Sequence, residues 1–283
     1  MSLKEDKNKI KTGLYVVSTP IGNLSDITLR ALNVLNGSDV ILCEDTRISK
    51  KLLHNYKIEK KTIPYHKFNE KKVLENIIDI LKDGKIVSVI SDAGTPTISD
   101  PGKILINRCI KENIVITPIP GPSAVTTALS ISGFSDQFYF HGFLSDKENS
   151  IKKEFKMLDK LQCSIIFFIS AQKLAKRLNL FNEFFNEREI LICRELTKIH
   201  ESLYRGKVSD IKNIKLISKG EFTIVISEKK EVAINDLNES DKVKIRNLFK
   251  NTSVKDIVRI FSQEKNISKS KIYNYCLQIK NEN

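Results

Sequence analysis

Two short stretches of this sequence combine carboxylates with cationic side chains. They are EDTR at residues 44–47 and RELTK at residues 194–198. A carboxylate can accept the proton of an attacking hydroxyl group, and arginine or lysine can hold a phosphate group. Either glutamate is therefore a candidate base, and each cation is a candidate phosphate ligand. Five of these side chains are taken as candidate catalytic residues: Glu44, Asp45, Arg47, Glu195 and Lys198.

Both stretches also have simpler structural explanations. Asp45 precedes an amphipathic segment, so its carboxylate is well placed to cap a helix that begins at Thr46. Glu195 and Lys198 follow a strand-like run, and such a pair is also typical of a solvated strand end. The chemical interpretation therefore depends on which other residues the fold brings to these two stretches.

Residues 85–102, KIVSVISDAGTPTISDPG, have the pattern of a strand that ends in a binding loop. Residues 86–90 are mostly β-branched and apolar, which predicts a short buried strand. In the loop that follows, Gly94 permits a positive φ and a close backbone approach, and two prolines stiffen the chain. Asp92 brings a carboxylate to the strand end. A turn-rich connection without a ligand is the alternative.

Two more stretches repeat this pattern of an apolar strand followed by a rigid loop. They are Leu14 to Leu24, LYVVSTPIGNL, and Ile114 to Ala124, IVITPIPGPSA. Open α/β sheets bind ligands outside the carboxyl ends of their strands. The three strand ends therefore predict one shared ligand crevice.

The motifs TPIGNL, EDTR, SDAGTP and PGPSA, in this order and spacing, resemble those of the tetrapyrrole-methylase-like superfamily. Within it they are more similar to the ribosomal RNA branch, the small-subunit 2′-O-ribose cytidine methyltransferases. The resemblance continues through Gly142-Phe143-Leu144, RELTK and Gly220-Glu221. It covers nearly the whole chain from about Gly13 onward.

The resemblance implies S-adenosylmethionine as the cofactor, bound in a crevice between two domains, and a homodimer. It implies six cofactor-binding residues: Pro20, Asp92, Ala93, Gly94, Ser123 and Ala124. Ordinary turn, bend and helix-start roles remain the structural alternatives for these positions. Methyl transfer from a sulfonium is an in-line displacement that needs no metal, so alignment of the reacting atoms should supply most of the catalysis.

The sequence departs from the family pattern in two places. Close relatives carry Tyr-Glu-Ser-x-His-Arg after one strand of the second domain, whereas this chain reads FISAQK at residues 168–173. Ile169 and Gln172 thus replace a carboxylate and a histidine. In addition, Leu144 is followed by Ser145-Asp146 rather than by proline and a basic pair. Either those family residues are not needed for the chemistry, or this protein handles its substrate differently.

Several other classes of site lack their sequence signals. No G-x-G-x-x-G follows the first strand, and the chain has no P-loop, H-E-x-x-H or C-x-x-C pattern, so no dinucleotide or metal site is expected. The five scattered cysteines are typical of buried thiols in a reducing compartment. The N-terminus is polar, and the longest apolar run, residues 165–169, is too short to span a bilayer. We therefore expect a cytoplasmic protein with no membrane contact.

Alternating strand-like and helix-like segments predict an α/β fold. By the resemblance, this fold has two α/β domains of the tetrapyrrole-methylase type. We expect a disordered basic tail (1–12), a mainly parallel domain (13–119), a mixed-sheet domain (120–232) and a basic helical segment (236–283). The expected strands are 14–18, 39–43, 85–91, 114–119, 137–143, 164–170, 189–195, 202–206 and 222–227. The expected helices are 26–35 (capped by Ser25 or Asp26), 46–56, 70–81, 103–111, 123–131, 148–161, 171–186, 208–216, 239–249, 253–264 and 268–279.

The C-terminal segment carries a large share of the net charge of +13. From Ser240 to Asn283, ten Lys or Arg residues stand against four Asp or Glu residues, a net charge of +6. Its last two helices, with Thr252 or Ser253 and Ser268 as caps, form a helix-turn-helix pattern. A basic helical unit favours contact with nucleic acid, although a helical cap with solvated lysines is the alternative. We expect RNA contacts at Arg194, Lys269 and Lys271.

Three functions follow from these observations. The first is a methyltransferase that acts on the 2′-hydroxyl of a cytidine in the decoding region of 16S ribosomal RNA, free or in the small subunit. The second is a methyltransferase for a tetrapyrrole or another small molecule, for which a basic appendage is unnecessary. The third is a non-enzymatic nucleic-acid-binding regulator, which has no use for three rigid strand-end loops.

Overall fold

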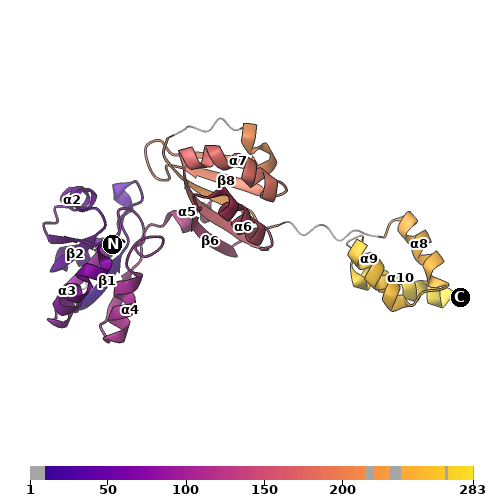
Figure 1. Ribbon diagram of the computed structural model, residues 1–283, viewed down its shortest axis with the longest axis horizontal. Coiled ribbons are helices and arrows are strands. Elements are labelled where there is room, and N and C mark those ends of the chain that lie inside the picture. Colours follow the sequence, from indigo (N-terminus) through magenta and orange to yellow (C-terminus); the bar gives the residue numbers. More distant parts are fainter. Residues whose placement is uncertain (1–9, 214–218, 230–236, 265–266, 283) are drawn as a thin grey trace, which may run out of the picture. The chain divides into compact units, whose positions relative to one another are not determined.

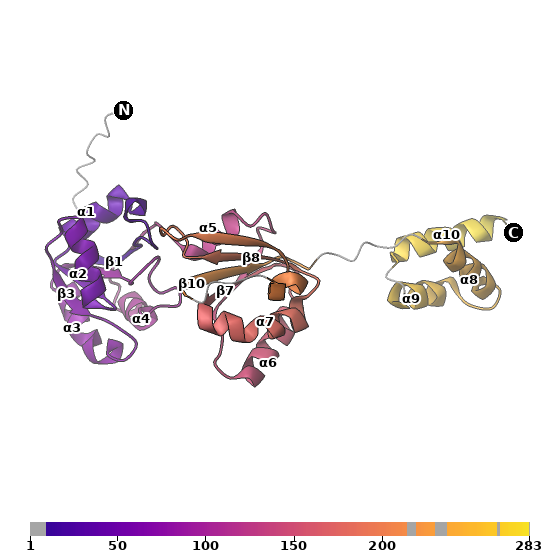
Figure 2. The same cartoon turned by 90° about the horizontal axis from the view of Figure 1, so that it is seen from above.

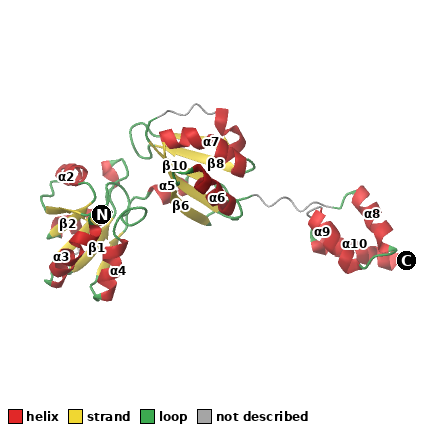
Figure 3. Ribbon diagram, viewed as in Figure 1, coloured by secondary structure: helices red, strands yellow, loops and turns green. Residues whose placement is uncertain are grey.

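The computed structural model describes residues 10–213, 219–229, 237–264 and 267–282. The chain divides into two units, residues 1–228 and 229–283, and each is considered by itself. The first unit contains two five-stranded sheets with their helices, and the described part of the second consists of helices (Figures 1 and 3).

The first sheet is parallel throughout, because a helix connects each strand to the next. Its strand order is β3-β2-β4-β1-β5. The strands are β1 (Gly13–Val17), β2 (Val40–Cys43), β3 (Lys61–Pro64), β4 (Ile86–Ile90) and β5 (Ile116–Ile119). The helices are α1 (Leu29–Gly37), α2 (Thr46–Asn55), α3 (Glu70–Lys82) and α4 (Lys103–Lys111).

Both faces of this sheet are covered, which explains its apolar strands. Leu14 and Leu42 pack in a cluster with α3 and α4, whereas their neighbours Tyr15 and Ile41 pack in a cluster with α1 and α2. Because both faces are filled by side chains, a ligand reaches this sheet at the strand ends.

The second sheet is mixed, as the sequence predicted: β6 and β7 are parallel and the other pairs are antiparallel. Its order is β6-β7-β10-β8-β9. The strands are β6 (Phe138–Phe143), β7 (Ser164–Ser170), β8 (Glu189–Arg194), β9 (Ser202–Lys207) and β10 (Glu221–Ile226). Helices α6 (Glu148–Leu158) and α7 (Ala171–Phe185) lie on one face, and the short helix α5 (Ala124–Ser130) lies on the other (Figure 2).

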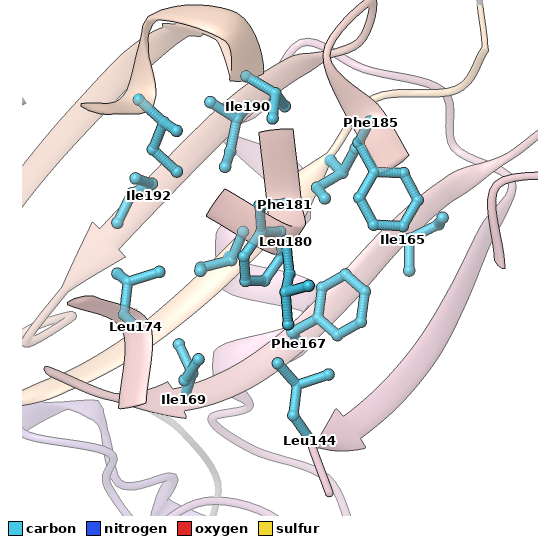
Figure 4. Close-up of a cluster of buried hydrophobic side chains, with 14 of the residues drawn as sticks. Leu144, Ile165, Phe167, Ile169, Leu174, Leu180, Phe181, Phe185, Ile190 and Ile192 are labelled. Carbon is cyan, nitrogen blue, oxygen red and sulfur yellow. The ribbon is translucent and has the colours of Figure 1, made fainter. Parts of the chain in front are cut away.

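An aromatic core fixes the second sheet against α6 and α7. Phe155, Phe181 and Phe185 are almost fully buried, and the ring of Phe155 lies 5.0 Å from each of the other two. Phe167 of β7 joins them, and Figure 4 shows Phe181 and Phe167 among the aliphatic side chains of the strands. Burying such rings contributes on the order of 2–3 kcal/mol each, so this cluster gives the second sheet a rigid base.

The second unit has an apolar core of its own. Helices α8 (Glu239–Phe249), α9 (Val254–Glu264) and α10 (Lys269–Glu282) pack around Ile245, Ile257 and Ile272. The hydroxyls of Ser253 and Ser268 accept hydrogen bonds from backbone N–H groups three residues later, so the predicted caps of α9 and α10 are confirmed. The turn between these helices includes residues 265–266, which lie outside the described part.

The sequence misplaced the start of the first helix. α1 begins at Leu29 rather than Asp26, and its cap is Thr28, whose hydroxyl accepts the N–H of Ala31 at 3.1 Å. The prediction of Ser25 or Asp26 as cap was wrong because Ile27 and Thr28 have extended backbone angles. Residues 24–26 instead form a separate 3₁₀ turn capped by Asn23.

Three smaller differences concern segments with little apolar patterning. Strand β3 was missed, because it is a short edge strand with an exposed lysine and a terminal proline. The expected helix 208–216 is a 3₁₀ helix at 208–213, and its last three positions lie outside the described residues. Of the expected disordered tail, residues 1–9 also lie outside them. Ile10, by contrast, packs against the α1 and α2 cluster, and Lys11 accepts a hydrogen bond from the Tyr15 hydroxyl.

Candidate functional site

Hydrogen bonds join the loops that follow β1, β4 and β5. Thr19 and Gly94 exchange two backbone hydrogen bonds of 2.9 and 3.1 Å. The hydroxyls of Ser18 and Thr95 lie 3.0 Å apart, and that of Thr95 donates to the carbonyl of Pro122 at 3.2 Å. The three strand ends therefore form one connected floor, as the sequence predicted.

A cavity of about 340 Å³ opens above this floor and is also bounded by the second sheet. This volume lies within the range of small-molecule sites, about 300–1,000 Å³. Loops and strand ends from both sheets contribute its lining residues: Ile21, Asp92–Thr95, Ile98–Asp100, Ser123–Val125, Phe143, Phe168–Ser170, Glu195, Leu196, Lys198 and Glu221–Thr223.

Five of the six expected cofactor residues line this cavity: Asp92, Ala93, Gly94, Ser123 and Ala124. Pro20 does not; it is buried beside Ile21, which supplies the first loop's lining side chain. Asp92 also has a structural role, because its carboxylate accepts the backbone N–H of Asp45 at 3.1 Å. That bond ties the end of β4 to the start of α2.

Positive φ values recur in two loops that contribute to the cavity wall. In the loop after β4, Gly94 has a φ of 79°, and the non-glycine residues Thr97 and Ser99 have φ values of 70° and 72°. In the loop after β8, Glu195 and Thr197 have φ values of 52° and 63°. Left-handed conformations cost non-glycine residues on the order of 1–3 kcal/mol and occur often at ligand sites. The surrounding fold therefore holds both loops in fixed, unfavourable conformations.

Asp100 is a carboxylate of the cavity wall that the sequence analysis did not single out. Burial, followed by the negative charge of Glu44, raises the pKa of Asp100 from 3.8 to about 6, although the Ser91 hydroxyl acts in the opposite direction. The Asp-Pro-Gly turn that ends the loop was its only sequence signal, and a turn by itself does not indicate chemistry.

Glu44 lies near this carboxylate group but does not itself line the cavity. Burial and the neighbouring Asp92 raise the pKa of Glu44, and His66 lowers it in part. The acidic groups here thus raise one another's proton affinity.

Asp45 and Arg47 pair with each other rather than with the cavity. The Asp45 carboxylate caps α2 by accepting the N–H of Arg47 at 2.8 Å, and it forms an ion pair of 2.7 Å with the same residue's guanidinium. Hydrogen bonds from Arg47 lower the pKa of Asp45 to about 2. The capping interpretation of Asp45 is therefore confirmed, and Arg47, whose side chain is 87% exposed, extends into solvent.

Glu195 and Lys198 lie in the wall formed by the second sheet. The Lys198 ammonium contacts Glu195 at 3.1 Å and Glu221 at 2.8 Å. Burial acts to raise the pKa of Glu195, but the backbone N–H of Glu221 and the Lys198 ammonium outweigh it and lower that pKa. Glu195 is therefore ionised, and its hydrogen bonds with Glu221 and Lys198 stabilise the loop after β8.

Arg194, which the sequence suggested for RNA contact, lies inside the fold. Its side chain is 8% exposed, and its guanidinium donates to the carbonyls of Lys219 and His200 at 2.8 and 2.9 Å. The residue therefore holds two loops together from the inside. The other two expected RNA residues, Lys269 and Lys271, lie exposed on α10 of the second unit.

The departure from the family pattern falls partly in the cavity wall. Phe168, Ile169 and Ser170 line it, whereas Gln172 and Lys173 are exposed outside it and Lys173 pairs with Asp146 at 2.6 Å. The side chains that replace the family's carboxylate and histidine are thus one apolar wall residue and one exposed amide.

In the described part of the chain, no three His, Cys, Asp or Glu side chains are arranged to hold a metal ion. None of the helices described there has the length and apolar character needed to cross a membrane.

Comparisons with known proteins agree with this architecture. Residues 13–212 match the family model described as Tetrapyrrole (Corrin/Porphyrin) Methylases. A crystal structure of uroporphyrin-III C-methyltransferase from Thermus thermophilus, complexed with S-adenyl homocysteine, has a TM-score of 0.55 at 13% identity and covers 76% of this chain and 97% of its own. That level of identity supports the fold alone.

Curated relatives are more similar. The "Ribosomal RNA small subunit methyltransferase I" of Mesomycoplasma conjunctivae is 47% identical over 82% of this chain and 98% of its own length. The protein of the same name from Rickettsia prowazekii is 44% identical over 93% of this chain and 96% of its own. On this evidence the chain belongs to the tetrapyrrole (corrin/porphyrin) methylase family and, within it, to the ribosomal RNA small subunit methyltransferases I.

Proposed function

We propose that this protein transfers the methyl group of S-adenosylmethionine to the ribose 2′-hydroxyl of a cytidine in the decoding region of 16S ribosomal RNA. One observation carries the proposal: residues from three strand-end loops, expected to hold the cofactor, line one cavity together with the RELTK loop of the second sheet. The relatives' shared name supports the choice of ribosomal RNA over a tetrapyrrole.

The cavity suits a cofactor that carries positive charge. When bound, S-adenosylmethionine supplies an activated methyl group on a sulfonium. Asp92 and Asp100 line the cavity, and Glu44 lies near them, so the wall formed by the loop after β4 is acidic. Gly94 has no side chain and so leaves room for a ligand to approach closely, and Ser123 and Ala124 at the start of α5 line the same cavity.

Asp100 is our candidate for the group that accepts the proton of the attacking hydroxyl. A base works best when its pKa lies near the working pH, and burial raises the pKa of Asp100 to about 6. Glu44 assists by raising that pKa. Glu195 and Lys198, both engaged in ion pairs, position the wall formed by the second sheet rather than exchange protons.

RNA contacts, in this proposal, come from exposed cations of both units. Arg47 extends from the rim of the first unit, and Lys269 and Lys271 lie exposed at the start of α10. The basic helical segment 236–283 then serves as an RNA-holding domain in addition to two catalytic α/β domains, 13–119 and 120–232. We further propose that the protein acts in the cytoplasm as a homodimer.

Two measurements test the proposed function. Calorimetry should detect S-adenosylmethionine binding to the purified protein, and absence of binding would favour a nucleic-acid regulator. Small subunits from a strain lacking the enzyme, incubated with methyl-labelled cofactor, should then acquire label in their RNA. Label in a tetrapyrrole mixture but not in subunit RNA would support the small-molecule alternative.

A further inference from the structure

An irregularity in β6 directs an aromatic side chain toward the cavity. Phe140 pairs with Ile166 of β7, but the next paired residue is Gly142, which lies opposite Phe167. One extra residue, His141, is thus inserted as a β-bulge, and Gly142 has a φ of 79°. Bulges next to active sites commonly redirect a side chain.

The bulge decides which face of the sheet Phe143 occupies. Phe143 comes three residues after Phe140, so in a regular strand the two side chains would point to opposite faces of the sheet. With the bulge, Phe143 pairs with Phe168, which shares the face of Ile166 and Phe140. The ring is thereby turned away from the α6 and α7 core and toward the cavity.

Phe143 is largely exposed although its ring packs against another aromatic ring. Its ring packs against Phe168 at 5.5 Å, and Phe168 packs against Phe140 at 5.0 Å, so three rings form a continuous row. Nevertheless, Phe143 remains 63% exposed while it lines the cavity. A ring that packs against Phe168 and is still largely exposed to solvent offers a surface on which another flat, apolar group can stack.

The loop that carries Asp100 lies beside this ring. A Cβ added to Gly142 would lie 3.2 Å from the Ser99 hydroxyl, so the bulge and the loop after β4 are in close contact. Ile98 of the same loop also lines the cavity and is 46% exposed. The aromatic ring, an aliphatic side chain and the carboxylate therefore lie within one small region.

We infer that Phe143 is the platform on which the base of the target nucleotide stacks, with Ile98 as an apolar neighbour. The inference rests on the proposed function. Stacking on exposed aromatic rings is how proteins hold bases that have left a helix. Because an RNA chain approaches from solvent, its base can reach only a ring that is exposed, and Phe143 is such a ring. A base held there directs its ribose toward the region of Asp100.

The test compares Phe143→Ala with a matched control, Phe138→Ala. Phe138 lies on the same strand and is 43% exposed, but it does not line the cavity. For each variant, calorimetry gives the Kd for S-adenosylmethionine, and methylation of unmodified small subunits gives KM and kcat. Phe143→Ala should lower kcat/KM for subunits about 10- to 100-fold, with the cofactor Kd changed less than twofold. Phe138→Ala should match wild type in every value.

Two conservative variants separate stacking from packing. Phe143→Tyr should retain activity, whereas Phe143→Leu should keep the melting temperature without restoring kcat/KM. A parallel loss of cofactor affinity in Phe143→Ala, or full activity in Phe143→Leu, would overturn the inference. These results differ from failure of the proposed function itself, in which wild-type protein would not methylate subunit RNA at all.

Discussion

The backbone N–H of Asn23 donates a hydrogen bond of 3.0 Å to the hydroxyl of Thr197. These residues lie 174 positions apart in the sequence and belong to the loops that follow β1 and β8. Beside this bond, Gly22 fits so closely that an added Cβ would lie 2.5 Å from Cγ of Lys198 and 2.9 Å from the carbonyl oxygen of Leu196. The TPIGNL and RELTK motifs thus form one contact at the edge of the cavity.

Gly22→Ala should therefore displace the RELTK loop. Because a backbone oxygen cannot move as easily as a flexible side chain, we expect at least a tenfold loss of cofactor affinity with a small change in Tm. Gly206→Ala is the matched control, since an added Cβ there meets nothing within 4 Å. Calorimetry on both variants checks this prediction, and equal affinities in the two would show that the contact does not shape the site.

Gly94→Val should abolish cofactor binding. A branched side chain there is strained by the positive φ, and its Cβ would lie 3.2 Å from Cγ2 of Ile21. Gly133→Val controls for the strain alone, because Gly133 has a φ of 74° with nothing within 4 Å. Both variants should lose similar stability in thermal melts, but only Gly94→Val should lose binding. Retained affinity in a folded Gly94→Val protein would remove this glycine from the site.

Asp100→Asn should make the protein more stable at neutral pH. The pKa of Asp100 is about 6 in the folded protein against an ordinary 3.8, so the folded state binds more protons between these values and stability falls as pH rises through them. The neutral amide removes that cost, which we put at about 1 kcal/mol after solvent screening, or a Tm increase of about 2–4 °C. The gain should vanish below about pH 4.

The same variant tests the proton-accepting role. Wild-type kcat should fall as pH decreases through about 6, because protonated Asp100 cannot accept a proton. Asp100→Asn, assayed at saturating S-adenosylmethionine because it also removes an acidic group from the cavity wall, should lose about 10²–10⁴-fold in kcat and lose this acid limb. A wild-type acid limb that persists in the variant would assign the proton transfer to another group.

Removing residues 229–283 should weaken RNA binding but leave cofactor binding near wild type, since every cavity residue precedes them. With two to four lost phosphate contacts, the log–log salt slope of RNA binding should flatten by roughly 1.5–3 units. An unchanged slope in a well-folded truncated protein would move the RNA surface to the rim near Arg47 and Lys198. Early melting or aggregation with an unchanged slope would instead identify the segment as a helical cap.

Much of the fold could be predicted because local patterns and packing agree. Strand β4 and the loop that contains Gly94 have the conformations that their apolar run and glycine favour. The cap of α2 was likewise predictable, because Asp45 bonds within its own turn. In these cases the two partners of the interaction lie within a few residues of each other in the sequence.

The remaining features depend on partners that are distant in sequence. The burial of Arg194 depends on carbonyls of two loops, at Lys219 and His200. The direction of Phe143 depends on a bulge that only the pairing with β7 defines. The raised pKa of Asp100 depends on burial and on Glu44, 56 positions earlier in the sequence. No local pattern contains this information.

Mass mapping of nuclease fragments of 16S ribosomal RNA, with nucleoside analysis of any labelled fragment, tests the proposed methyl transfer most directly. Unmodified small subunits would be incubated with the purified protein and S-adenosylmethionine carrying a heavy methyl group. The expected result is one heavy methyl group, on the ribose of a single cytidine in the decoding region. A heavy methyl group on a base, on ribose outside that region, or on no nucleotide of the RNA would contradict it.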